Sequence, residues 1–308
     1  MFRAIITLAA LSRVLACPDH APLSGLARRD DEVVAGAWTF DDQENWAAHS
    51  VTCGNGTMQS PIDLKGGDFS AVYAPKFDYS IPARRYTPFS PIPLDPKQRH
   101  ALPPCLGNQI SKHNQNRQLS QNTANLVTDG TLKNWGYGPS FDFNDTSSTP
   151  TFTVNNTVYY LLGFHTHTQS EHTVDGEHTP AEVHLVHGEI DGTPRGVVGF
   201  RIVVGKESPF FKQFLVSRTV NIPAINSTER IAMESIDMSL ALQEGGNLES
   251  YWTYRGSLTT PPCTEGKRWW VSGKNIQMSQ EQLDELLSVS ADSSRETQEI
   301  NEHDVGQL

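Results

Sequence analysis

Three apolar segments separated by Asp-Gly pairs lie between residues 158 and 205, and they constrain the fold more than any other part of the chain. Residues 158–168 are rich in β-branched and aromatic side chains, residues 181–190 alternate in polarity, and residues 197–204 are apolar again. The pairs Asp175-Gly176 and Asp191-Gly192 are typical of tight turns between antiparallel strands. The pattern predicts an antiparallel meander at the centre of a sheet.

Helical patterns are short and few, at residues 208–216, 227–233 and 279–289. No internal repeat is present, so we expect a mainly β fold with short helices in one domain spanning residues 36–308. Residues 80–118 are rich in Pro, Asn, Gln and Arg and have no apolar period. Because motifs lie on both sides of this stretch, we interpret it as an insertion within the domain rather than a linker between two domains.

The first 16 residues have the pattern of a secretory signal peptide. Arg3 is followed by a short apolar run, and Val14-Leu15-Ala16 places small residues before a cleavage point. Residues 17–35 then form a leader or a loose N-terminal arm. Four Asn-x-Ser/Thr sequons follow, which makes these side chains candidate glycosylation sites: Asn55, Asn144, Asn155 and Asn226. Together these features predict a secreted glycoprotein.

The net charge of −11 and the pI of about 5.4 argue against nucleic acid and anionic membranes as partners. No stretch reaches the roughly 20 apolar residues that a membrane span needs. The four cysteines are Cys17, Cys53, Cys105 and Cys263, and none forms a Cys-x-x-Cys pair. Zinc-finger and thioredoxin-like sites are thereby excluded.

Histidines fall on one face of two neighbouring predicted strands. His165 and His167 are two residues apart, as are Glu182 and His184 on the next strand, so each pair shares a face. A hairpin can bring these faces together, and three imidazoles can then converge with a fourth position open. This arrangement is typical of a catalytic zinc site. Such a pair on one strand also occurs in cupin-type iron sites, which need a carboxylate ligand as well.

Several strings together resemble the alpha class of carbonic anhydrases. They are FHTH at residues 164–167, SEH at 170–172, EVHLVH at 182–187, QSPI at 59–62, YWTY at 251–254, GSLTTPP at 256–262 and RETQ at 295–298. The resemblance runs from about residue 38 to residue 301. It implies a central, largely antiparallel twisted sheet of about ten strands, with Zn²⁺ at the bottom of a conical cleft.

The same resemblance implies reversible hydration of carbon dioxide to bicarbonate and a proton, with a zinc-bound hydroxide as the nucleophile. It assigns His165, His167 and His184 as zinc ligands and Glu182 as the partner of the third ligand. Thr259 and Glu171 would orient the hydroxide, since Thr259 must donate its proton to the carboxylate. The substrate pocket would be lined by Val186, Val197, Leu258, Thr260 and Trp269. We interpret His172 and His187 as packed structural residues.

The resemblance also implies a disulfide between Cys53 and Cys263, which would hold the loop that carries Thr259. Three positions depart from the family pattern. Asn122 stands where the family usually has a proton-shuttling histidine, Gly163 where it often has Gln beside the first ligand, and Lys267 where it tends to have an apolar pocket residue. These departures bear on the speed of the reaction more than on its existence.

Two other functions compete with the enzyme. A carbonic-anhydrase-like binding module, catalytically weak, typically loses one or more zinc histidines, whereas all three are present here. A cupin-type metallo-oxygenase would explain neither QSPI nor SLTT. The favoured interpretation, a carbonic anhydrase, predicts carbon dioxide and bicarbonate as substrates, with sulfonamides and small anions as inhibitors.

Overall fold

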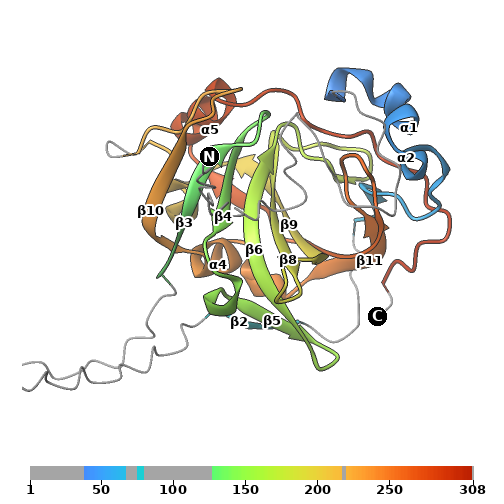
Figure 1. The fold of residues 1–308 in the computed structure, drawn as a ribbon, viewed down its shortest axis with the longest axis horizontal. Helices are drawn as coiled ribbons and strands as arrows, with labels where there is room; N and C mark the ends of the chain where they lie inside the picture. The colour runs from blue at the N-terminus through green and yellow to red at the C-terminus, as the bar shows by residue number, and fades with distance from the viewer. Residues whose placement is uncertain (1–37, 67–74, 80–126, 217–219, 307–308) are drawn as a thin grey trace, which may run out of the picture.

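The computed structural model describes residues 38–66, 75–79, 127–216 and 220–306 (Figure 1). The expected signal peptide at 1–16, the leader at 17–35, the insertion at 80–118 and Asn122 all lie outside the described residues. Cys17 and Cys105 lie outside them as well.

An 11-stranded sheet forms the body of the molecule (Figure 1). Its main path runs β10-β3-β4-β6-β8-β9-β12-β11, with β13 paired to β9 and β5 paired to both β2 and β6. The strands are β2 Lys76–Asp78, β3 Val127–Asn134, β4 Pro139–Phe143, β5 Thr151–Val154, β6 Thr157–His167, β8 Ala181–Gly188, β9 Pro194–Val204, β10 Arg230–Asp237, β11 Tyr251–Ser257, β12 Glu265–Ser272 and β13 Ile276–Met278. A separate pair joins β1 Asp63–Leu64 to β7 Thr173–Val174.

The predicted meander is the centre of this sheet. Strands β6, β8 and β9 pair antiparallel, with His165 opposite His184 and Val186 opposite Val197. Every residue of β8 is buried, because the sheet is covered on both faces. The prediction of a mainly β fold with a large sheet is confirmed. The sheet is mixed, however, since β12 and β13 both run parallel to β9.

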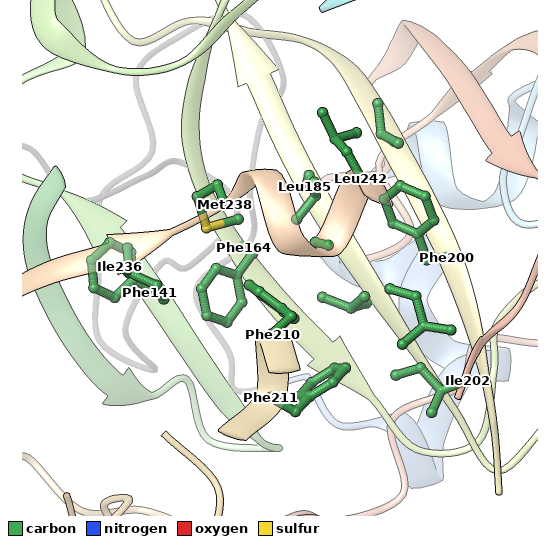
Figure 2. Packing of buried hydrophobic residues seen from close by; sticks show 14 of the residues in the cluster. Phe141, Phe164, Leu185, Phe200, Ile202, Phe210, Phe211, Ile236, Met238 and Leu242 are labelled. Atoms are coloured by element: carbon green, nitrogen blue, oxygen red, sulfur yellow. The ribbon is translucent and has the colours of Figure 1, made fainter. Parts of the chain in front are cut away.

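Short helices cover parts of the sheet. They are the 3₁₀ helices η2 Phe40–Asn45, η4 Thr146–Ser148 and η5 Gly246–Leu248, and the α-helices α1 Trp46–His49, α2 Val51–Asn55, α3 Pro209–Lys212, α4 Ser239–Glu244 and α5 Gln280–Ser288. Figure 2 shows Phe210, Phe211 and Leu242 from α3 and α4 facing Phe164 and Leu185 of the sheet. This apolar cluster is the main core. None of the helices in the described ranges has the length and apolar character needed to cross a membrane.

The helix expected at residues 227–233 is wrong. Residues from Arg230 onward form β10, whose backbone pairs antiparallel with β3. Ile231 and Met233 pack against the main core from this strand. Pairing at the sheet edge thus overrides the local helical preference of the segment. The helix expected at 279–289 is present as α5, capped by Ser279 and Gln282 in a capping box, whereas only the short α3 forms within 208–216.

The segment after α5 returns across the molecule toward the N-terminal helices (Figure 1). The backbone N–H of Ser293 donates to the carbonyl of Thr168, and that of Gln298 donates to the carbonyl of Pro61. These contacts join residues more than 100 positions apart in the chain. They bring the end of the domain beside the histidines of β6.

Candidate metal centre

Three histidine side chains converge where β6 and β8 lie side by side. His165, His167 and His184 are 7%, 1% and 1% exposed. The cross-strand pairing of His165 with His184 places both rings on the same face. One nitrogen from each of the three rings lies within 4.8 Å of the others. The structure therefore brings together the three imidazoles that the sequence pattern singled out.

The donor set suits zinc. Nδ1 of His184 lies 3.3 Å from Nε2 of His165. That separation is close to the edge of a tetrahedron whose centre lies roughly 2.0–2.1 Å from each nitrogen, the usual zinc–histidine bond length. Burial also lowers the pKa of His184, and this favours the neutral ring that a metal requires.

Hydrogen bonds to the far nitrogens fix the orientation of two rings. Nδ1 of His167 donates to the carbonyl of Ser293 at 2.6 Å, and Nε2 of His184 donates to Oε1 of Glu182 at 2.9 Å. Because a carbonyl or carboxylate oxygen can only accept, the proton of each ring must sit on the nitrogen that faces it. The lone pairs of the other nitrogens then point to the common centre.

Glu182 is the hub of a buried polar network. Besides His184, its carboxylate accepts from the backbone N–H of His172 at 2.9 Å and from Nδ1 of His172 at 2.7 Å. Burial alone would raise the pKa of Glu182, but its interactions with the two histidines lower that pKa well below the ordinary value. Nε2 of His172 lies 2.7 Å from the hydroxyl of Tyr254. His172 is thus a buried, hydrogen-bonded residue, as expected.

His172, Glu182 and His184 also form a group with the donor types of a metal site. Their atoms already satisfy one another through the hydrogen bonds just described. His184 and His165, by contrast, line a cavity. The three imidazoles could therefore hold a metal ion, with Glu182 and His172 supporting His184 through hydrogen bonds.

Glu171 lies beside the imidazoles and is fully buried. Its Oε2 is 3.5 Å from Nε2 of His167, and its Oε1 accepts from the backbone N–H of Arg295 at 3.0 Å. Burial raises the pKa of Glu171 well above its ordinary value, while hydrogen bonds from the Thr259 side chain and from Arg295 oppose that rise. The Thr259 side chain therefore lies close enough to Glu171 to lower the pKa of its carboxyl.

A small cavity opens above the imidazoles. It offers about 20 Å³ of space for the centres of water-sized molecules, little more than one ordered water needs. All five expected pocket residues line it, together with Thr259, two of the histidines and one unexpected aromatic side chain. The lining residues are Trp135, His165, His184, Val186, Val197, Leu258, Thr259, Thr260 and Trp269.

The disulfide Cys53–Cys263 is present and joins α2 to the loop after Thr259 and Thr260. Cys263 is fully buried. The amide of Gln59 donates to the carbonyl of Cys263 at 3.1 Å, so the QSPI segment supports the same loop. The loop that carries the two threonines is therefore held from two sides.

The structure describes two of the three positions that depart from the family pattern. A Cβ atom at Gly163 would lie 2.2 Å from the carbonyl oxygen of Phe141 on β4, so this position has no space for a side chain. Lys267 is buried, donates to the carbonyl of Pro194 at 3.1 Å, and is not among the residues that line the cavity. Asn122, the third departure, lies outside the described residues.

Sequence reasoning missed three contributors to the site. Trp135 lines the cavity, Ser293 orients His167 through its carbonyl, and Arg295 supports Glu171 through its N–H. The RETQ string marked Arg295 without a role. Ser293 and Arg295 act through backbone groups, and only the path of the chain places these beside the site. Trp135 acts through its side chain.

The fold is a large β-sheet, and its buried cluster of three histidines could hold a metal ion. Residues 90–305 match the profile of the eukaryotic-type carbonic anhydrase family. Alpha carbonic anhydrase 5 of Arabidopsis thaliana is 32% identical over 243 residues, which cover 78% of this chain and 70% of that protein. The chain therefore belongs to the alpha carbonic anhydrase family.

Two further relatives match about half of this chain. Alpha carbonic anhydrase 3 of Arabidopsis thaliana is 32% identical over 155 residues, and the match spans 53% of that protein, about half its length. Dioscorin DB3S of Dioscorea polystachya is 30% identical over 166 residues, covering 51% of this chain and 56% of that protein. Among solved structures, the alpha-carbonic anhydrase of Thermovibrio ammonificans in complex with the inhibitor sulfanilamide has a TM-score of 0.61 at 26% identity, with 88% of this chain and 97% of that chain covered.

Proposed function

We propose that this protein catalyses the reversible hydration of carbon dioxide to bicarbonate and a proton, with Zn²⁺ held by His165, His167 and His184. The observation that carries the proposal is the convergence of three buried imidazole nitrogens below a cavity that also presents Thr259. Zn²⁺ bound there would supply a Lewis acid that makes water nucleophilic near neutral pH.

The protein's own residues orient the reactants. The Thr259 hydroxyl donates its proton to Glu171, so its oxygen is free to accept a hydrogen from the attacking water species. That contact directs a lone pair of the nucleophile into the cavity. Val186, Val197 and Leu258 offer an apolar wall with no hydrogen-bond donor, which suits a linear apolar molecule such as carbon dioxide.

Metal analysis combined with a hydration assay tests this proposal. We expect about one zinc per purified molecule, rapid hydration of carbon dioxide, loss of both on treatment with a strong chelator, and recovery when zinc is restored. Small anions and sulfonamides should inhibit by competing for the open position. Absence of hydration in a fully zinc-loaded protein would contradict the proposal and favour a carbonic-anhydrase-like binding module.

We also propose that the protein is exported and glycosylated. Support comes from the signal pattern in residues 1–16, from the disulfide Cys53–Cys263, and from the exposure of Asn55, Asn144, Asn155 and Asn226. N-terminal sequencing of protein from the culture medium tests export. The change in mass of that protein on enzymatic glycan removal tests glycosylation. A protein that stays in the cells, keeps residues 1–16 and carries no glycan would contradict both points.

A further inference from the structure

Among the residues that the structure describes, Trp135 is the only one lining the cavity that comes from the turn between β3 and β4. Its ring centroid lies 5.7 Å from that of His165 and 5.4 Å from that of His167. The other cavity walls come from the central strands and from the loop after β11. The indole therefore forms the wall that the β3–β4 turn contributes to the site, beside His165 and His167.

The turn that carries Trp135 is firmly held. Oδ1 of Asn134 accepts from the backbone N–H of Gly136 at 3.0 Å and from that of Gly138 at 3.1 Å. The φ angle of Gly136 is 109°, a conformation that favours glycine. The indole Nε1 donates to the carbonyl of Thr166 at 3.2 Å, which ties the ring to β6 between two of the histidines.

Aromatic side chains support the indole. The ring of Tyr137 lies 5.1 Å from it and that of Phe40 lies 6.1 Å away. Phe40 in turn packs on Tyr137 at 4.8 Å. A ring held between these aromatic rings, the imidazoles and a backbone hydrogen bond cannot swing aside without breaking several contacts.

We propose that Trp135 is a size-selecting residue that favours small linear or compact ligands at the metal site over ligands with an aromatic ring. The inference rests on the proposed function, because it assumes zinc at the three imidazoles. The space at the imidazoles supports it: this space suits a molecule near the size of carbon dioxide or azide, so a benzene ring attached to a zinc-binding group has to extend past the residues that line it, Trp135 among them.

The test compares two zinc-binding probes by isothermal titration on the zinc-loaded protein. Azide represents a small linear anion, and benzenesulfonamide carries an aromatic ring. In Trp135→Ala, the ratio of the benzenesulfonamide affinity to the azide affinity should rise at least about tenfold, since the steric conflict is removed. Trp135→Phe, which keeps an aromatic ring and threatens the fold less, should give a smaller rise. Trp38→Ala is the matched control, because Trp38 belongs to the same aromatic cluster but does not line the cavity.

The outcomes separate this inference from the proposed function. A protein that holds no zinc overturns both. A protein that holds zinc and binds azide, but whose affinity ratio is the same in wild type, Trp135→Phe and Trp135→Ala, overturns the size selection alone. An equal rise in Trp38→Ala also overturns it, because loosening of the aromatic cluster would then be the cause. Failure of hydration in the zinc-loaded protein leaves the affinity ratio measurable and contradicts only the proposed function.

Discussion

Strand β8 presents the metal site on one face and the main core on the other, although all eight of its residues are buried. Glu182, His184 and Val186 alternate with Val183 and Leu185, so the two sets project from opposite faces. The first set meets the cavity and the polar network. The second packs into the apolar cluster drawn in Figure 2.

The two faces depend on different interactions. On the site face, each polar group has a directional partner, as Glu182 has in His172 and His184. On the core face, stability comes from apolar area and close packing, which have no direction. Burial alone therefore does not distinguish a functional side chain from a structural one in this strand. Substitutions on the two faces should have separable effects.

The largest effect is expected from His184→Ala on the site face. The change removes one of three donors and leaves Glu182 without one of its hydrogen-bond partners. Zinc content should fall far below one per molecule, and kcat/KM for hydration should drop by more than about a hundredfold, since even supporting residues cost 10–100-fold. Metal analysis and stopped-flow hydration measure both. Full zinc occupancy with near-normal turnover would show that this face is not the metal site.

Leu185→Ala on the core face should have the opposite profile. Leu185 is fully buried in the main core, so its truncation should lower the free energy of unfolding by about 2–5 kcal/mol. The folded fraction should retain its zinc, because no ligand or ligand partner is touched. Chemical denaturation together with metal analysis of the folded protein checks this. Loss of zinc at unchanged stability would contradict the separation of the two faces.

The sequence predicted elements that have strong local patterns and missed those that depend on distant partners. Alternation and the Asp191-Gly192 turn located β6, β8 and β9 to within a few residues at most ends, because these strands carry strong local patterns. Asp175-Gly176 turns the chain after β7 and does not join β6 directly to β8. The parallel pairing of β12 with β9 was not predicted, since it joins segments about 70 residues apart. The strand at 230–237 was misread as part of a helix because its identity depends on β3, its partner in the sheet.

The site shows the same limit. The three imidazoles and the Thr259–Glu171 contact follow from residue type and spacing together with the family resemblance. The carbonyl of Ser293 could not be predicted, because any residue supplies a carbonyl and only the path of the chain places this one at His167. Trp135 was missed because an aromatic residue in a turn does not differ, in sequence, from one that packs in a core.

His187 is the polar residue on the core face of β8, and its protonation makes the stability contributed by that face depend on pH. Its Nε2 lies 2.7 Å from the Tyr79 hydroxyl, and its Nδ1 donates to the carbonyl of Leu185 at 2.9 Å. Burial lowers the pKa of His187 to about 3 from 6.5. The unfolded chain takes up a proton near pH 6.5 and the folded chain only near pH 3, so stability from the neutral ring is complete above pH 6.5 and is lost as the pH falls.

Between pH 6.5 and pH 5 this loss amounts to about 2 kcal/mol, at roughly 1.4 kcal/mol per pH unit. His187→Gln keeps a donor and an acceptor but does not titrate. The variant should therefore lose less stability over this interval than wild type. The slope of its unfolding free energy against pH should be smaller by the equivalent of up to one bound proton. Urea unfolding at several pH values measures the slope. Equal slopes in both proteins would show that His187 is not held neutral by the core.

The smallest expected effect is on the transfer of the proton that hydration releases. Whether a histidine can accept this proton depends on the face of the sheet from which it projects. A shuttle needs a group whose pKa lies near the working pH, for which histidine is suited. The only titratable residues that line the cavity in the described ranges are His165 and His184, both proposed as ligands. His187 lies on the opposite face, and Nδ1 of His178 lies 2.6 Å from the carbonyl of Ser170, away from the cavity lining.

We therefore expect protons to leave to the buffer. At saturating carbon dioxide, kcat should rise several-fold as the concentration of imidazole or another neutral-pH buffer is raised, whereas kcat/KM should stay constant because the chemical step is untouched. Asn122→His, at the shuttle position that the family resemblance predicts, should raise kcat at low buffer concentration and weaken the buffer dependence. His178→Gln is the matched control and should leave the dependence unchanged, because it removes a histidine that does not line the cavity. Turnover that is already fast and indifferent to buffer in wild type would show that another residue carries the proton, and that the interpretation of Asn122 is wrong.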